Sequence, residues 1–414
     1  MDRRGRPRAR REVDVSVHHP DAVAGVSLTH VPMALSVQGS TLISVAQSIV
    51  DTSSALGIAS TAILSHNRDV SIKGAELRYV DYTRNCPREW FTKQELATDM
   101  VAGALGLTRP YYGRVYDPAI EAVSASEADV TLLYEGHYAS ATLPRWAAVR
   151  KKSTLVLYCH NPLSRSYRRR ELRRLLAQAD VVAFCADHLR RDVEERLNGD
   201  LPSRLMTVHN GIDPAFKPAP QPPTSDVFTV VFAGITSPHK GPHLALEAVH
   251  LASQRVHRPL RLQIFGSHSY GHGTSELTEY ERSLRSKADT MQAQVEFHPF
   301  VPKSELSERL RLASVACLPS QWAEGLPLIA LESMASGLPV ITSDSVGMVE
   351  AVGESGFVIP GGDAEGMAEV IVTLAESETM RSTAAQKALI RAQAFSWEHV
   401  ARTFAALRPR GAAG

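Results

Sequence analysis

The amino-acid sequence predicts an α/β protein made of two doubly wound domains that face one central cleft. Three observations support this prediction. The chain has 414 residues, which is too many for one ordinary compact domain and enough for two with separate cores. In both halves, apolar runs of strand length alternate with helical stretches, the order typical of parallel sheets covered on both faces. A proline-rich segment separates the halves.

The first half begins after residues 1–11, a basic segment that we expect to be a disordered tail. Contact of this tail with nucleic acid or acidic lipid is the less favoured alternative. Residues 12–214 form the expected N-terminal domain, in which helical stretches separate most of the strand-like runs. These runs span 25–34, 59–64, 77–80, 130–134, 154–159, 181–185 and 205–208.

The linker between the halves, residues 215–226, is defined by its prolines. Five prolines stand between positions 214 and 223, a density that disfavours a helix or a central strand. Residues 227–392 form the expected C-terminal domain, and residues 393–414 contain one further helix. In the second half the expected strands are 228–232, 260–265, 295–298, 315–318 and 339–342, and the expected helices are 242–251, 276–289, 303–313, 330–336 and 395–407.

The composition favours a small-molecule ligand and a reducing compartment. The formal net charge is +1 and 21% of the residues are charged, so nothing indicates a nucleic-acid partner. Cys86, Cys159, Cys185 and Cys317 form no Cys-x-x-Cys pair, and three of them lie in apolar runs, which favours buried thiols over a metal site. No apolar segment follows the basic N-terminus and no run has the length of a membrane span, so we expect a cytoplasmic protein.

Two carboxylates, Glu324 and Glu332, frame the segment Glu-Gly-Leu-Pro-Leu-Ile-Ala-Leu-Glu between a strand-like run and a helix. Eight residues are about two and a quarter helical turns, so both side chains would project from one side of a helix and could hold two parts of one ligand. Gly325 and Pro327 stand where strand gives way to helix, the place where open parallel sheets bind ligands. Alternatively, Glu324 lies in the loop before the helix and Glu332 is an ordinary surface residue.

The residues around this pair form a longer pattern. It consists of Cys317-Leu318-Pro319-Ser320, Glu324-Gly325, the run from Leu331 to Ile341, Gly347 and Glu350. This pattern resembles the donor-site signature of glycosyltransferase family 4, whose members have two Rossmann-like domains in the arrangement called GT-B. The resemblance is strong over residues 228–360, and it extends to the first domain through the order of strands and His160.

The resemblance implies a retaining glycosyltransferase that moves a sugar from a nucleoside-diphosphate sugar to a hydroxyl of a small-molecule, glycan or lipid-linked acceptor. It implies that Glu324 holds the transferred sugar, that Glu332 holds the ribose hydroxyls and that Lys240 meets the diphosphate. His160, which follows the strand-like run 154–159, would contact the sugar from the opposite domain. The other implied donor-site residues are Gly234, Gly325, Leu326 and Pro327. The C-terminal helix would cross back to brace the first domain.

Two glycine-containing loops could bind phosphate. Residues 234–241 follow a strand-like run and precede a helix, so their backbone N–H groups and Lys240 could face an anion. The family has an arginine at the position of Ile235. Either His239, one of the loop amides or an arginine of the first domain takes its place, or donor binding is weak. Gly39 and Ser40 resemble the family's loop between acceptor and leaving phosphate. In either case, Ser40 or Thr41 would cap the following helix.

No Asp-x-Asp pair occurs in the sequence, which suits a mechanism that needs no metal ion or other cofactor. A nucleotide-sugar epimerase or a glycan phosphorylase of the same architecture is an alternative. Ile235 also leaves open a sugar-nucleotide-binding protein without catalysis.

Six arginines crowd the stretch from Arg165 to Arg174. They could contact acidic lipid at the inner face of the membrane, or a phosphorylated acceptor. A solvated helix face is the favoured interpretation.

Overall fold

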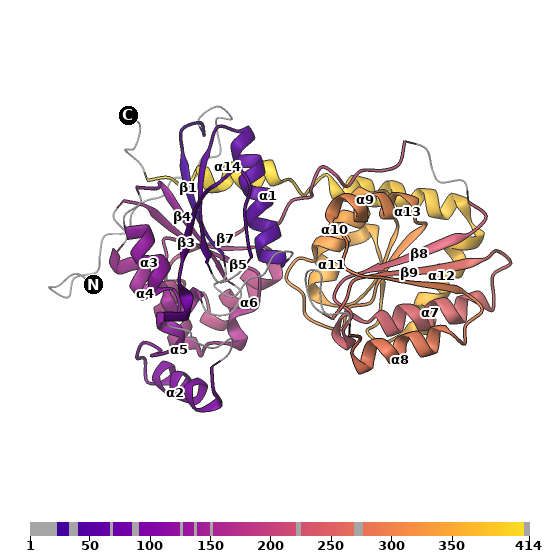
Figure 1. Ribbon diagram of the computed structural model, residues 1–414, viewed down its shortest axis with the longest axis horizontal. Helices are drawn as coiled ribbons and strands as arrows, with labels where there is room; N and C mark the ends of the chain where they lie inside the picture. Colours follow the sequence, from indigo (N-terminus) through magenta and orange to yellow (C-terminus); the bar gives the residue numbers. More distant parts are fainter. Residues whose placement is uncertain are drawn as a thin grey trace.

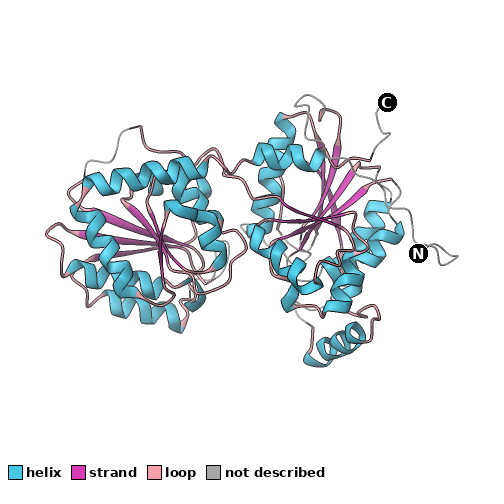
Figure 2. Ribbon diagram, turned by 180° about the vertical axis from the view of Figure 1, so that it is seen from behind, coloured by secondary structure: helices cyan, strands magenta, loops and turns pink. Residues whose placement is uncertain are grey.

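A computed structural model of the protein describes residues 23–32, 40–66, 69–84, 91–124, 127–135, 139–149, 152–220, 225–268 and 276–409. These residues form two α/β domains, each with a parallel sheet between layers of helices (Figures 1 and 2). Within the described ranges, the N-terminal sheet has the strand order β3-β2-β1-β4-β5-β6-β7, and the C-terminal sheet has the order β10-β9-β8-β11-β12-β13. Each order reverses at a central strand, the topology of a doubly wound fold.

The N-terminal sheet has a buried centre. β4 and β5 are buried at every position, because their sequences VTLLYE and TLVLYC are almost continuously apolar. The strands are β1 (Ser27–Val31), β2 (Ala59–Ser65), β3 (Glu76–Val80), β4 (Val130–Glu135), β5 (Thr154–Cys159), β6 (Val181–Phe184) and β7 (Arg204–Thr207). The helices are α1 (Thr41–Ala55), α2 (Lys93–Ala104), α3 (Asp117–Ser124), α4 (Ala139–Val149), α5 (Arg169–Leu176) and α6 (Asp187–Leu197).

The C-terminal sheet is built in the same way around β8 and β11, which are buried throughout. The strands are β8 (Phe228–Ala233), β9 (Leu260–Phe265), β10 (Gln294–His298), β11 (Val315–Leu318), β12 (Val340–Ser343) and β13 (Phe357–Ile359). The helices are α7 (Pro242–Ser253), α8 (Glu279–Ala288), α9 (Lys303–Leu312), α10 (Leu328–Ala335), α11 (Val346–Val352), α12 (Ala364–Glu376), α13 (Glu378–Ala392) and α14 (Trp397–Ala405).

The predicted fold class is confirmed, with differences at the ends of elements. The first strand is Ser27–Val31 rather than 25–34, because Gly25 lies in a turn with a left-handed backbone. The sequence analysis did not separate β13 and the helices α11 to α13, which complete the C-terminal domain. The basic tail 1–11 and residues 221–224 of the linker lie outside the described residues.

The last helix, α14, packs on the N-terminal domain beside α1 (Figure 1). Phe404 of α14 is fully buried, and its ring meets Tyr158 of β5 edge to face with 5.0 Å between the ring centroids. Gly211 lies so close to the backbone of Trp397 that a side chain there would overlap it. The chain therefore crosses between the domains twice, at the linker and before α14.

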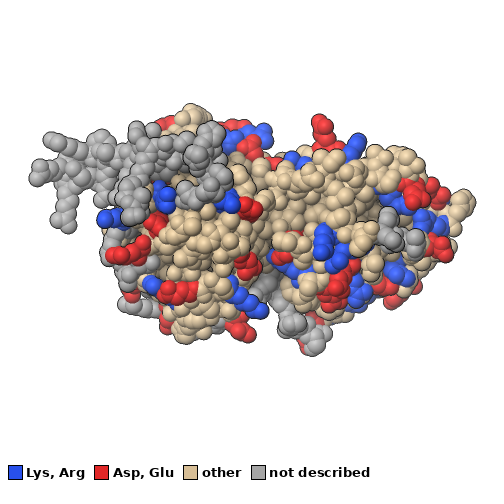
Figure 3. All heavy atoms as spheres, turned by 90° about the horizontal axis from the view of Figure 1, so that it is seen from above, with Lys and Arg blue, Asp and Glu red and all other residues tan. Residues whose placement is uncertain are grey.

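Apolar packing is continuous across the domain interface. One hydrophobic cluster includes Cys185 and Leu189 of the N-terminal domain together with Leu326 and Met348 of the C-terminal domain. A second cluster lies within the C-terminal domain around β8, α7 and α12. On the face seen in Figure 3, basic and acidic side chains are interspersed, as the small net charge suggests. No helix among the described residues is long and apolar enough to cross a membrane.

A buried ion pair fixes the segment that follows α2 to α5. Arg109 Nε donates to Glu171 Oε1 at 2.7 Å, and the two side chains are 9% and 2% exposed. Gly103 of α2 faces the Glu171 carboxylate so closely that a methyl group there would overlap it. The pair and the glycine together allow α2 to approach the rest of the N-terminal domain.

Replacing Glu171 with alanine should destabilise the N-terminal domain by about 3–5 kcal/mol, because the Arg109 charge would stay buried without its partner. Urea unfolding measures this change. The matched control is Glu76→Ala, which breaks an exposed ion pair with Arg78. The control should cost at most about 1 kcal/mol. Equal losses in both variants would contradict the role of the buried pair.

Candidate functional site

A cavity of about 510 Å³ opens between the two domains, at the carboxyl ends of both sheets. It gathers every predicted site residue that the structure describes. These residues are Ser40, His160, Gly234, Lys240, Glu324, Gly325, Leu326, Pro327 and Glu332. Gly39 lies outside the described residues. The cavity is therefore one site with walls from both domains.

Glu324 receives two side-chain contacts at one carboxylate oxygen. Lys240 Nζ forms an ion pair with Glu324 Oε1, and Ser320 Oγ donates to the same oxygen at 2.8 Å. Lys240 ends the short turn after β8, and Ser320 follows the neighbouring strand β11. Adjacent strands thus bring both partners to Glu324. The arrangement places a fixed hydrogen-bond acceptor and a positive charge side by side.

The two carboxylates of the motif do not share a helix. α10 begins at Leu328, four residues after Glu324, and Pro327 takes its N-cap position. The prediction that both side chains project from one side of a helix is therefore wrong. Pro327 disfavours helical backbone in the residue before it, so Glu324 stays in the loop. The loop and the helix bring the two carboxylates to the cavity separately.

Glu332 lies on α10 and is only 8% exposed, so its interpretation as an ordinary surface residue is wrong. Burial raises the pKa of Glu332 to about 7, the Lys303 ammonium opposes this rise, and Asp213 adds to it. Lys303 lies at the start of α9, with its Nζ 3.4 Å from Asp213 Oδ2 and 3.4 Å from Ser48 Oγ. The carboxyl group of Glu332 can therefore donate or accept hydrogen bonds at neutral pH.

His160 follows β5 and lines the cavity while being 7% exposed. Burial lowers the pKa of His160 to about 4, so the ring is neutral at physiological pH. Hydrogen bonds with the Tyr158 backbone and the Asn210 side chain partly oppose this lowering of the pKa. The ring packs edge to face on Tyr158, with 4.3 Å between centroids. A fixed neutral imidazole can offer one donor and one acceptor to a ligand.

The start of α1 is the other contribution of the N-terminal domain. Ser40, Thr41 and Ser44 line the cavity. Ser40 takes the predicted N-cap position of α1, but its side chain makes no capping hydrogen bond. An N-terminus of this kind favours anions. Ile235, where the family has arginine, lines the opposite wall and adds no charge.

The sequence analysis assigned no role to several cavity residues. These are Asn210, Lys303, Ser320 and Trp322. Ser320 lies two residues after the end of β11. This place at the carboxyl end of a parallel strand is the signal that could have assigned it a role in the site. Asn210 accepts a hydrogen bond from Tyr158 at 2.9 Å, a contact between residues 52 positions apart that no local pattern indicates.

The two domains and the site between them are those of a glycosyltransferase with the GT-B fold. The family model described as "Glycosyltransferase Family 4" matches residues 86–216, and the model described as "Glycosyl transferases group 1" matches residues 215–391. The chain belongs to glycosyltransferase family 4. The predicted resemblance is thereby confirmed.

The curated relatives are named D-inositol 3-phosphate glycosyltransferase. The one from Kribbella flavida is 29% identical over 56% of this chain and 58% of its own length. The one from Acidothermus cellulolyticus is 34% identical over 55% and 54%. For the relative from Corynebacterium efficiens, 27% identity extends over 78% of both chains. The chain thus spans little more than half of the length of the first two relatives.

Solved structures share the fold. Anabaena HepE in complex with UDP has a TM-score of 0.67 at 17% identity, covering 91% of this chain and 98% of HepE. Sucrose-phosphate synthase from Thermosynechococcus elongatus has a TM-score of 0.65 at 15% identity, covering 91% and 97%. At these identities the likeness extends to the GT-B fold alone.

Glu332→Gln should make the protein more stable than the wild type above about pH 7, and leave it nearly unchanged below about pH 4. Between the ordinary carboxyl pKa and about 7, folded Glu332 keeps a proton that the unfolded chain has released. The wild type therefore loses stability as the pH rises through this window, and glutamine avoids that loss. Melting temperatures from pH 4 to 9, compared between the two proteins, test this expectation. A difference that is independent of pH would contradict it.

Proposed function

We propose that this protein is a retaining, metal-independent glycosyltransferase, which moves a sugar from a nucleoside-diphosphate sugar to an acceptor hydroxyl. The observation that carries the proposal is the single cavity in which Glu324, Glu332 and Lys240 of one domain face His160 of the other. Membership of family 4 supports the same chemistry. The acceptor would be a small molecule or a glycan.

Each donor group has a matching side chain in this proposal. Glu332 accepts or donates hydrogen bonds to the ribose hydroxyls, and Lys240 meets the diphosphate. Glu324 accepts hydrogen bonds from the transferred sugar, and His160 contacts that sugar from the other side of the cleft. Gly234, Gly325 and Leu326 would offer backbone N–H groups, while Pro327 starts α10 and shapes its N-terminus.

The diphosphate carries about two negative charges, and among the described lining residues the cations are Lys240 and Lys303. With isoleucine at position 235, the amide groups at the start of α1 are the next source of positive potential. They come from the opposite domain, so domain closure would complete the neutralisation of the diphosphate. Gly39 and Ser40 belong to this side of the proposed phosphate site.

Retention would follow from departure and attack on one face of the sugar. In this proposal the leaving phosphate accepts the acceptor's proton, while Lys240 stabilises the developing negative charge. Closure of the domains would exclude water and so favour transfer over hydrolysis. The absence of an Asp-x-Asp pair from the sequence supports metal independence.

The acceptor is proposed by analogy with the relatives. Their name contains a phosphorylated inositol, so a polyhydroxylated ring is the first acceptor class to test. Contact with lipid through the arginines of 165–174 is the weaker extension. Arg173 pairs with Asp200, and Arg174 donates to the carbonyl of Leu107, so part of this cluster already has partners in the protein.

One nucleoside diphosphate among UDP, GDP, ADP and dTDP should raise the melting temperature by a few degrees, because it binds the folded state alone. EDTA should leave the shift unchanged if no metal ion mediates binding. A thermal-shift panel with and without Mg²⁺ measures both. If none of the four stabilises the protein, the cavity does not bind these nucleotides, and the non-catalytic alternative becomes the better explanation.

Glu324→Ala should lower donor turnover by about tenfold or more, while binding of the nucleoside diphosphate persists. Turnover can be followed as acceptor-dependent transfer and as slow donor hydrolysis. Glu369→Ala, at an exposed position of α12, is the matched control. Full activity in Glu324→Ala would contradict the site assignment. A product with an altered sugar and no need of acceptor would favour the epimerase.

A further inference from the structure

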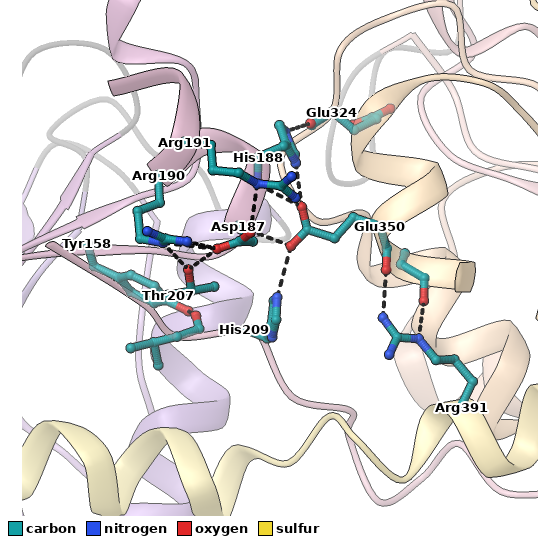
Figure 4. Close-up of polar contacts among 12 residues, drawn as sticks. Tyr158, Asp187, His188, Arg190, Arg191, Thr207, His209, Glu324, Glu350 and Arg391 are labelled. Atoms are coloured by element: carbon teal, nitrogen blue, oxygen red, sulfur yellow. Dashed lines mark hydrogen bonds and ion pairs between the residues drawn. The ribbon is translucent and has the colours of Figure 1, made fainter. Parts of the chain in front are cut away.

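Glu350 of α11 reaches across the domain interface (Figure 4). Its carboxylate accepts hydrogen bonds from the backbone N–H groups of Asp187 and His188, the latter at 2.9 Å. It also contacts His188 Nδ1 at 2.7 Å and His209 Nε2 at 2.9 Å. One side chain of the C-terminal domain is thus held by four groups of the N-terminal domain.

The carboxylate caps α6 from outside its own domain. Asp187 and His188 are the first two residues of α6, and the N-cap residue Ala186 has no side chain that could serve their N–H groups. Burial opposes ionisation of Glu350, but the hydrogen bonds from His188, His209 and the α6 amides outweigh it and hold the pKa of Glu350 far below its ordinary value. Glu350 is therefore ionised, and its charge lies at the positive end of α6.

The backbone that carries Glu350 is also fixed. Arg391 of α13 donates to the carbonyl oxygens of Glu350 and Ala351, at 2.7 and 3.0 Å. These carbonyl groups lie in the last turn of α11, where no later N–H group of the helix can donate to them. Figure 4 shows Arg391 on the side of Glu350 away from α6. The carboxylate is therefore presented to the N-terminal domain from a braced helix.

His188 connects Glu350 to the loop between β11 and α10 that carries Glu324 and Gly325, called the motif loop below. Its Nδ1 faces Glu350 Oε2, and its Nε2 lies 3.1 Å from the carbonyl oxygen of Glu324. Both partners are acceptors without a hydrogen, so both contacts are hydrogen bonds only when both ring nitrogens are protonated. The geometry therefore fits the imidazolium form, which bridges a carboxylate and the backbone of Glu324.

The other charged groups around His188 form contacts with partners other than its ring. His209 contacts the second oxygen of Glu350. The Asp187 carboxylate accepts hydrogen bonds from Arg190 at 2.9 Å and pairs with Arg191 at 2.8 Å. Lys240 is paired with the side chain of Glu324 rather than with its carbonyl oxygen. Glu350 and the Glu324 carbonyl are thus the two groups that His188 bridges.

The motif loop has little freedom to shift once this bridge is made. A side chain at Gly347 would overlap the carbonyl oxygens of Glu324 and Gly325, and one at Gly325 would overlap the carbonyl oxygen of His160. The Glu324–Gly325 backbone is therefore enclosed between α11 and the end of β5. This backbone segment belongs to the C-terminal domain, but contacts with both domains fix its position.

We propose that His188 and Glu350 are positioning residues, which lock the Glu324–Gly325 backbone to the N-terminal domain and so couple domain closure to the placement of the Glu324 carboxylate. The catalytic consequence rests on the proposed glycosyl transfer. The mechanical coupling does not, because it can be measured without a substrate. Neither residue touches the ligand in this proposal, since neither lines the cavity.

The experiment compares wild type, His188→Ala and Glu350→Gln, with the exposed positions His399→Ala and Glu369→Gln as matched controls. Hydrogen–deuterium exchange is followed in two segments, residues 185–190 and 322–327. Both segments should exchange faster in the two test variants, and exchange in the β8 strand and in the control variants should stay as in the wild type. Faster exchange in 185–190 alone would overturn the proposal, because Glu350 would then only cap α6.

The second measurement is kinetic. With the donor identified by nucleotide binding, kcat should fall about tenfold in both test variants while the donor KM changes less, because neither variant alters Glu332 or Lys240, the proposed contacts of the ribose and the diphosphate. An unchanged kcat in both test variants would overturn the positioning role. If the wild type shows no transfer at all, the proposed function fails, and the exchange experiment still decides the coupling.

Discussion

The structure depends on one close approach of backbones, where the Glu324–Gly325 segment passes between α11 and the end of β5. Glycine at positions 325 and 347 removes the side chains that would hold these three segments apart. The apolar cluster that joins the domains continues from there through Leu326. The cavity has walls from two domains because this contact lets them meet, and the charged network around Glu350 fixes the angle at which they do.

Three ionisable side chains of the cleft, those of Glu324, Glu332 and His160, have different surroundings. Glu324 forms an ion pair with Lys240, whereas burial raises the pKa of Glu332 to about 7. His160 is fully enclosed and stays neutral, with a pKa of about 4. The site can therefore present a charged acceptor, a carboxyl group that also donates, and an uncharged ring to one ligand.

The fold and most of the site could be predicted because their signals are local. The apolar runs of β4 and β5 fix the centre of one sheet, and residues 317–341 carry a family signature within a single strand–loop–helix unit. Other features depend on contacts between distant parts of the chain. Glu350 was visible as part of the signature, but its partner His188 lies 162 residues away. The expected helix 330–336 nearly matches α10, but the prediction that Glu324 and Glu332 project from one side of a helix was wrong, because their spacing was weighed above the proline between them.

The position of α14 has a consequence for the order in which the protein folds. Phe404 of this helix and Leu407 just after it complete the hydrophobic core of the N-terminal domain, although they are made after the C-terminal domain. During synthesis the N-terminal domain emerges first but lacks this part of its core until the whole C-terminal domain has left the ribosome. The C-terminal domain, whose second cluster contains only its own residues, can be complete earlier. The nascent chain would thus finish its second domain before its first.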